Sequence, residues 1–290
     1  MERLLVVGVD GSADSLRAVD WAADEAATHN IPLRIIHASR GERYTIANTA
    51  ASIHPGTIQM ESHHVMDHAT KRAFLRHRSL RISSVILNEF PIAALFRASQ
   101  DAYGVVIGSR GWGSEARPRP LGTVAMTVAA SAMSPVVVVR EIGREPGKRF
   151  HRVAAGIGPA QGTEAVLEFA VRDAALRMAD LEVVYGSYPY PTDCLPESHA
   201  RHISACDPNE AEPILERVLR ERAPFDDCPR VQRRFVRANP TDAILQASSA
   251  ADTLVLGACR RDSHVGMQLG RVSDAALRNS SCPVILVPYA

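Results

Sequence analysis

Two short segments carry residue types that could hold a phosphorylated ligand. The first is Asp10-Gly11-Ser12, which follows an apolar run and places a carboxylate beside a flexible turn. The second begins with Gly108-Ser109-Arg110-Gly111 and continues, ten residues later, with Gly122-Thr123 before an apolar, helix-like run. Glycines let backbone N–H groups approach phosphates closely, and a helix N-terminus adds unpaired donors and a favourable dipole. Together the two segments indicate a nucleotide site.

Short β-branched runs must position these segments. In the first half, the expected strands are Leu4 to Val9, Leu33 to Ala38, Ser83 to Leu87, Gly104 to Ile107 and Pro135 to Arg140. Helical periodicity between the first two strands, and a plausible helix from about Thr57 to His77, predict βαβ units and a parallel sheet. In such a sheet, ligands bind at the carboxyl ends of the strands, where the strand order reverses. Both candidate segments follow strands in this way.

The second half of the chain repeats the first. Residues 8–38 align without a gap with residues 156–186, and residues 134–139 align with residues 282–287 at the same offset of 148. The 290 residues also suit two domains of roughly 145. We therefore predict an α/β fold with two tandem, doubly wound, five-stranded parallel-sheet domains, over residues 1–142 and 149–290. A charged segment over residues 141–150, which contains glycine and proline, is the expected linker.

At these residues the sequence resembles the universal stress protein family. Its ATP-binding members carry an aspartate after the first strand and the pattern G-x-x-G, nine residues, G-[ST] after the fourth. The resemblance covers nearly the whole chain, twice, and implies an adenine-nucleotide α-hydrolase-like sandwich that binds ATP, with Mg²⁺ as a candidate companion. It implies that Asp10 lies by the ribose, that the main chain of Ala38 meets adenine, and that the Thr123 hydroxyl meets a phosphate oxygen or Mg²⁺. The full candidate site comprises Gly8, Asp10, Ala38, Ile107, Gly108, Arg110, Gly111, Gly122, Thr123 and Val124.

Both copies depart from this pattern. In the first copy, ten residues rather than nine separate Gly111 from Gly122. We expect the additional residue to affect the geometry of phosphate binding and not the binding of adenosine. Arg110, Arg117 and Arg119 could meet phosphates or could be solvated loop charges. In the second copy, Gly158 replaces Asp10, Arg260 replaces Gly111 and Arg271 replaces Thr123, which leaves only Gly257 and Gly270 of the set. We therefore expect ATP in the first copy alone.

The motifs favour a binding protein over an efficient enzyme. The sequence contains no G-x-x-x-x-G-K-[ST], G-x-S-x-G or H-E-x-x-H motif, and no catalytic residue can be assigned. The preferred function is a regulatory, ATP-binding module in a stress or growth-arrest response. The alternatives are a slow ATP hydrolase that uses the same site, and a nucleotide-free scaffold.

The composition of the chain limits the kinds of partner that we expect it to bind. The formal net charge of +1 offers no global basic field for nucleic acid or an anionic membrane. No apolar run approaches the roughly 18 residues of a membrane span, so we expect a cytoplasmic protein. Beyond an adenine nucleotide, the partner is an unidentified protein. The last strand of each copy, over residues 136–139 and 284–287, is expected at a sheet edge, where the two could pair within one chain as a pseudo-dimer. A homodimer that forms through other faces is an alternative.

Three further groups have a structural and a functional interpretation. His63, His64 and His68, with Asp67, could begin a helical zinc site, but a solvated helix face explains them better. The basic run from Lys71 to Arg81 is also interpreted as a solvated face. Cys259, beside Arg260 and Arg261, is a weaker candidate for a redox-active thiol.

Overall fold

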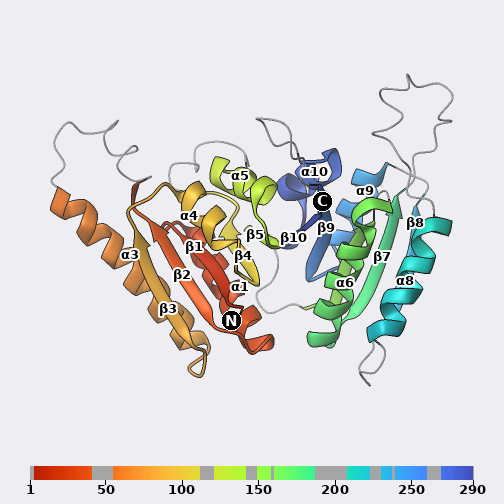
Figure 1. Cartoon of the computed structure of the whole chain (residues 1–290), viewed down its shortest axis with the longest axis horizontal. Helices are drawn as coiled ribbons and strands as arrows, with labels where there is room; N and C mark the ends of the chain where they lie inside the picture. The colour runs from red at the N-terminus through yellow and green to blue at the C-terminus, as the bar shows by residue number, and fades with distance from the viewer. Residues whose placement is uncertain are drawn as a thin grey trace. The chain divides into compact units, whose positions relative to one another are not determined.

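The computed structural model divides into two compact units, Met1–Glu141 and Ile142–Ala290 (Figure 1). It describes residues 3–40, 55–111, 121–141, 149–157, 160–186, 208–222, 230–236, 239–259 and 269–289. The two units are described separately below.

The first unit alternates strands and helices as the hydrophobic pattern predicts. Its elements are β1 (Leu5–Val9), α1 (Ala13–Thr28), β2 (Leu33–Ala38), α3 (Pro55–Arg76), β3 (Ile82–Leu87), α4 (Pro91–Ala98), β4 (Gly104–Gly108), α5 (Thr123–Ser131) and β5 (Val136–Val139). The strand order is β3-β2-β1-β4-β5, and the strands pair in parallel. All five predicted strands are confirmed, and each predicted end lies within one residue of the observed one.

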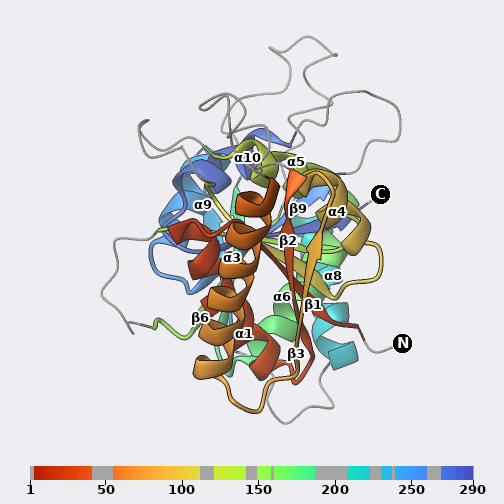
Figure 2. The same cartoon turned by 90° about the vertical axis from the view of Figure 1, so that its left-hand side faces the viewer.

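Helices cover both faces of this sheet. Figure 2 shows β2 and β3 between α3 and α4, with α1 beside α3. Because no face of the central strands meets water, β4 and β5 can be nearly continuous apolar runs, and the side chains of Val105, Val106 and Val136 are at most 1% exposed. This burial provides a rigid base for the loops that leave the carboxyl ends of the strands.

The basic run of α3 packs against acidic residues of α1. The Arg72 guanidinium donates to both carboxylate oxygens of Asp20, at 2.7 and 2.5 Å, and Arg76 holds Asp24 in the same way, at 2.5 and 2.7 Å. His77 Nε2 lies 2.8 Å from Asp24 Oδ1. The interpretation as a solvated face is therefore incomplete. The sequence could not show that the two helices lie side by side, and that arrangement gives the arginines their partners.

Substitution of Asp24 by asparagine should reveal a pH-dependent contribution to stability. Burial alone would raise the pKa of Asp24, but hydrogen bonds from Arg76 and His77 outweigh it and hold the pKa below its ordinary value of 3.8. The folded state therefore favours the carboxylate, and the stabilisation is present above pH 3.8 and is lost as the pH falls through the lower folded-state pKa. We expect the variant to lose about 1 kcal/mol of unfolding free energy at neutral pH, since the pair is partly exposed. Urea unfolding should show that this gap closes below pH 3.8, whereas a gap independent of pH would contradict the assignment.

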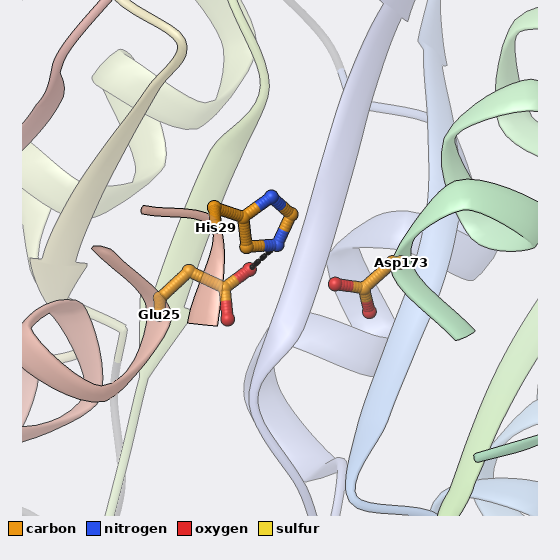
Figure 3. Close-up of side chains that lie close together, drawn as sticks. All are labelled: Glu25, His29 and Asp173. Carbon is orange, nitrogen blue, oxygen red and sulfur yellow. Dashed lines mark ion pairs between the residues drawn. The ribbon is translucent and has the colours of Figure 1, made fainter. Parts of the chain in front are cut away.

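The carboxyl-terminal end of α1 is closed by polar contacts. His29 Nε2 lies 3.1 Å from the Glu25 carboxylate, as drawn in Figure 3, and His29 Nδ1 lies 3.1 Å from the Tyr103 hydroxyl. The backbone N–H of His29 donates to the Glu25 carbonyl at 2.9 Å. These contacts fix the position at which the chain leaves the helix for β2.

The histidines of α3 face solvent. His63, His64, Asp67 and His68 are all exposed, and among the described residues they form no group able to hold a metal ion. This agrees with the interpretation as a solvated helix face.

The second unit repeats the same order of elements. It contains β6 (Arg152–Ile157), α6 (Ala160–Leu176), β7 (Asp180–Gly186), α8 (Pro208–Arg222), β8 (Val231–Val236), α9 (Pro240–Ser248), β9 (Thr253–Cys259), α10 (Arg271–Asn279) and β10 (Val284–Tyr289). Within this unit the strand order is β8-β7-β6-β9-β10, again in parallel. The order matches that of the first unit strand for strand. Pairing between β5 and β10 stays a prediction.

Across the described parts of both units, no helix combines the length and the apolar character that a bilayer span requires.

Candidate nucleotide site

The candidate residues gather where the winding of the first sheet reverses. β1 pairs with β2 on one side and with β4 on the other. The chain segments that follow β1 and β4 therefore leave the same sheet edge from adjacent strands. This is the position at which doubly wound sheets bind ligands.

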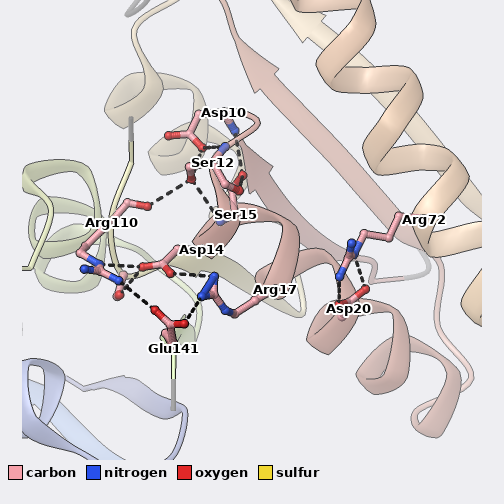
Figure 4. Close-up of polar contacts among 10 residues, drawn as sticks. Asp10, Ser12, Asp14, Ser15, Arg17, Asp20, Arg72, Arg110 and Glu141 are labelled. Atoms are coloured by element: carbon pink, nitrogen blue, oxygen red, sulfur yellow. Dashed lines mark hydrogen bonds and ion pairs between the residues drawn. The ribbon is translucent and has the colours of Figure 1, made fainter. Parts of the chain in front are cut away.

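The turn after β1 holds the Asp10 carboxylate in a fixed orientation. Gly11 has a φ of +82°, a left-handed conformation that favours glycine. Ser12 then donates to Asp10 Oδ1 twice, from its backbone N–H at 3.0 Å and from its hydroxyl at 2.6 Å (Figure 4). The Ser12 hydroxyl oxygen accepts from the Ser15 N–H at 3.2 Å and so caps α1. The carboxylate is thus pre-organised by the same residue that starts the helix.

The loop after β4 packs closely against this turn. A Cβ on Gly108 would lie 2.7 Å from the Asp14 carbonyl carbon and 2.8 Å from the Ser15 nitrogen, so only glycine fits. A Cβ on Gly111 would lie 2.6 Å from Asp10 Oδ2. The Gly122 N–H donates to the Ser109 carbonyl at 2.8 Å, which brings the start of α5 back to the loop.

The N-terminus of α5 lies beside this loop and has no side-chain cap. Gly122 occupies the N-cap position, where no side chain accepts from the first N–H groups of the helix. Thr123 follows as the first helical residue and is exposed, and Val124 is half-buried. An uncapped helix N-terminus beside glycines has the donors and the dipole that stabilise a phosphate.

The Arg110 side chain is held by two carboxylates. Its Nε donates to Asp14 Oδ2 at 3.1 Å, and its terminal nitrogen lies 3.6 Å from Glu141 (Figure 4). Asp14, only 4% exposed, also accepts from the Ser109 hydroxyl at 2.8 Å and pairs with Arg17 at 3.2 Å. Asp14 is not among the residues predicted for the site, although an acidic residue in the first helical turn, close behind the Ser12 cap, is a signal visible in the sequence. The network fixes the main chain of the loop and compensates the charge of Arg110.

The other candidate residues occupy three different settings. Gly8 lies under α4, where its Cβ would meet the Leu95 side chain at 3.0 Å, so its role is helix–sheet packing rather than contact with the turn. Ile107 is buried in β4. Ala38 is the last residue of β2, and the preceding residue, His37, pairs with Val9 of β1. The main chain of Ala38 therefore lies at the same sheet edge as Asp10. Arg117 and Arg119 lie outside the described residues.

The corresponding edge of the second unit is built differently. The ring of Tyr289 lies against Gly257 and Gly162, because a Cβ on either glycine would meet ring atoms at 2.8 or 2.5 Å. Arg271, exposed, replaces Thr123 at the start of α10. Gly158, Arg260 and Arg261 lie outside the described residues. Cys259 is exposed, and a redox role for it stays a hypothesis.

Comparison with known proteins places this architecture in one family. The sequence matches the universal stress protein family twice, over residues 1–140 and over residues 149–288. A universal stress protein of Mycobacterium tuberculosis is 34% identical, and the match covers 97% of this chain and 95% of that protein. Another, of Mycolicibacterium smegmatis, is 28% identical over 98% of this chain and 96% of that protein.

A solved structure supports the same fold. The crystal structure of a universal stress protein from Archaeoglobus fulgidus has a TM-score of 0.71 at 15% sequence identity, and the match covers 99% of this chain and 98% of that chain. Each unit is therefore a doubly wound α/β domain of this kind. The chain belongs to the universal stress protein family and carries two of its domains in tandem.

Proposed function

We propose that this protein is a regulatory nucleotide-binding module that holds one ATP at the carboxyl edge of β1 and β4. The observation that carries the proposal is the convergence of Asp10, Gly111 and Gly122 at the uncapped N-terminus of α5. A fixed carboxylate can accept hydrogen bonds from a ribose hydroxyl, and the glycine-lined helix start can donate to phosphates. These two chemistries stand side by side, as a nucleoside phosphate requires.

The position of each group suggests how the nucleotide would lie. The ribose would meet Asp10, and the adenine would meet the main chain of Ala38 across β2. The phosphates would extend from Gly111 towards Gly122 and Thr123, whose exposed hydroxyl could contact a phosphate oxygen or Mg²⁺. Arg110 would act through its main chain, because Asp14 and Glu141 already engage its guanidinium.

Three differences support occupancy of the first domain alone. Gly158 lacks the carboxylate of Asp10, and Arg260 adds a side chain where Gly111 leaves space. In addition, the Tyr289 ring packs against Gly257, whereas the backbone of α1 packs against Gly108 in the first domain. We infer that the second domain serves in packing and in presenting surface to a protein partner.

The groups around the site favour retention of ATP over its hydrolysis. Phosphoryl transfer to water needs a positioned nucleophile and charge stabilisation in the transition state. Here the Arg110 charge is compensated, and the Asp10 carboxylate is held by Ser12. The bound nucleotide would instead contact Gly111 and Gly122, at the two ends of the segment between them. These contacts would alter the surface that is available to a protein partner.

Phosphate release distinguishes the two functions. With saturating Mg-ATP, we expect the purified protein to bind nucleotide while it releases phosphate far more slowly than the roughly 1 s⁻¹ typical of slow enzymes. The measurement is a phosphate-release assay beside equilibrium dialysis of labelled ATP. Steady release that Thr123→Ala abolishes without loss of ATP binding would overturn the regulatory function in favour of a hydrolase.

A further inference from the structure

A concavity in the first unit lies apart from the candidate nucleotide site. It has a volume of about 880 Å³ and lies beside α4, against the face of the sheet formed by β1, β2 and β3. Its lining includes Leu4 and Arg34 near the amino ends of their strands, whereas Asp10 and Gly111 follow the carboxyl ends of theirs. A volume of this size is in the range of small-molecule sites.

The groove combines an apolar floor with cationic side chains. Val6 and Ile36 form the floor, and the partly exposed Val85 and Met133 extend the apolar surface. The cationic groups are Arg3, Arg34 and Arg97, against which Asp101 is the one acidic lining residue among the described residues.

Only one of these arginines has an acidic partner in the described parts of the chain. Arg97 pairs with Glu89 at 2.7 Å, and Arg34 donates only to the Ser83 hydroxyl, at 3.4 Å. Neither Arg3 nor Arg34 forms an ion pair with a described residue. Arg3 and Arg34 therefore bring positive charge to the groove that no ion pair with a described residue neutralises.

The second unit has the opposite charge at the equivalent strand position on this face. Glu182 occupies the position of Arg34, since Glu182 pairs with Ala154 as Arg34 pairs with Val6. Its carboxylate is only 7% exposed and lies 3.4 Å from both Arg152 and Arg234. These arginines replace Leu4 and Val85 of the first unit. The second unit thus neutralises the charges on this face within the chain, whereas in the first unit Arg34 has no carboxylate partner among the described residues.

We propose that the groove of the first domain binds an organic anion with an apolar body, whose carboxylate pairs with Arg34. The chain of the ligand would lie on Val6, Ile36 and Val85, and its anionic end would pair with Arg34, which has no carboxylate partner among the described residues. Charge-assisted hydrogen bonds from a guanidinium would select an acid over an uncharged amphiphile of the same length. The site is independent of the proposed ATP site.

Equilibrium dialysis of radiolabelled octanoate against the full-length protein tests this proposal. We expect saturable binding of one octanoate per chain, and 1-octanol should compete at least about tenfold more weakly than unlabelled octanoate. Arg34→Glu should weaken octanoate binding at least about tenfold, and Arg34→Gln, the milder change, should weaken it to a smaller extent. Arg172→Glu provides the matched control, because it reverses the charge of an exposed arginine on α6, outside the groove. Circular dichroism would confirm that each variant is folded.

The outcomes separate this site from its alternatives. Loss of octanoate binding in Arg34→Glu, with normal binding in Arg172→Glu and unchanged ATP binding in both, would support the proposal. Equal affinity for 1-octanol, no saturable octanoate binding to the wild type, or unaltered binding in Arg34→Glu would overturn it. A concentration-dependent dimer that Arg34→Glu dissociates, without octanoate binding, would overturn it in favour of a second copy of the chain on this face.

Discussion

Gly108→Ala is expected to lower the unfolding free energy by about 3 kcal/mol and to abolish ATP retention. The added Cβ would lie within 2.9 Å of three backbone atoms of Asp14 and Ser15, at the start of α1. Backbone atoms of a capped helix cannot move aside as the end of a flexible side chain can. The variant must therefore displace α1 or β4, and either shift separates Asp10 from Gly111. Urea unfolding and dialysis of labelled Mg-ATP measure the two effects.

Gly257→Ala is the matched control for this substitution. Gly257 holds the equivalent strand position in the second unit, but its Cβ would meet a ring atom of Tyr289 at 2.8 Å rather than backbone. We expect this variant to lose less stability and to retain ATP in the first domain. Equal losses of stability in the two variants, or full ATP retention in Gly108→Ala, would contradict the close packing of β4 against α1.

Asp10→Asn and Asp10→Ala should both weaken ATP binding, by about 10- to 100-fold, the amount expected when a hydrogen bond to a charged group is lost. They should differ in stability. Asparagine keeps a side-chain oxygen that can accept hydrogen bonds from the Ser12 N–H and hydroxyl. Alanine has no such acceptor, so both of these hydrogen bonds are lost. We therefore expect a loss of about 1 kcal/mol for alanine and a smaller loss for asparagine. Calorimetric titration with Mg-ATP and urea unfolding are the measurements.

Asp20→Asn controls for the loss of a carboxylate elsewhere in the first domain. Asp20 pairs with Arg72 on the α3 side of α1 and is not one of the candidate site residues. It should cost some stability and leave ATP affinity unchanged. Wild-type affinity in Asp10→Asn would show that the carboxylate does not contact the nucleotide.

The fold could be predicted from the sequence because each strand is a short, continuous apolar run between helical stretches. Burial on both faces makes such runs visible, as in Val136–Val139, where every side chain is buried. The second copy of the sequence shows the same hydrophobic pattern and so gives independent support to the fold prediction. What the sequence could not give was the pairing of α1 with α3, because the contact between Asp20 and Arg72 joins residues 52 apart.

The site was predictable only in part, for a related reason. Glycines and Asp10 have local signatures, since a turn and a close approach depend on the residue itself. The role of Arg110 depends instead on Asp14, 96 residues away, and on Glu141. An arginine in a glycine-rich loop suggests a phosphate contact until its partners are known. The contrast between Arg34 and Glu182 likewise requires the strand register, which the sequence alone does not provide.

We propose one ATP site per chain, in the first domain. The most direct test is the adenine nucleotide content of the freshly purified protein, released by heat and measured by chromatography, beside the Asp10→Ala/Gly122→Val double variant. Both samples should then be incubated with Mg-ATP and measured again. We expect about one adenine nucleotide per wild-type chain and none in the variant. No nucleotide in the wild type, even after incubation, would contradict ATP binding, and two per chain would contradict its restriction to the first domain.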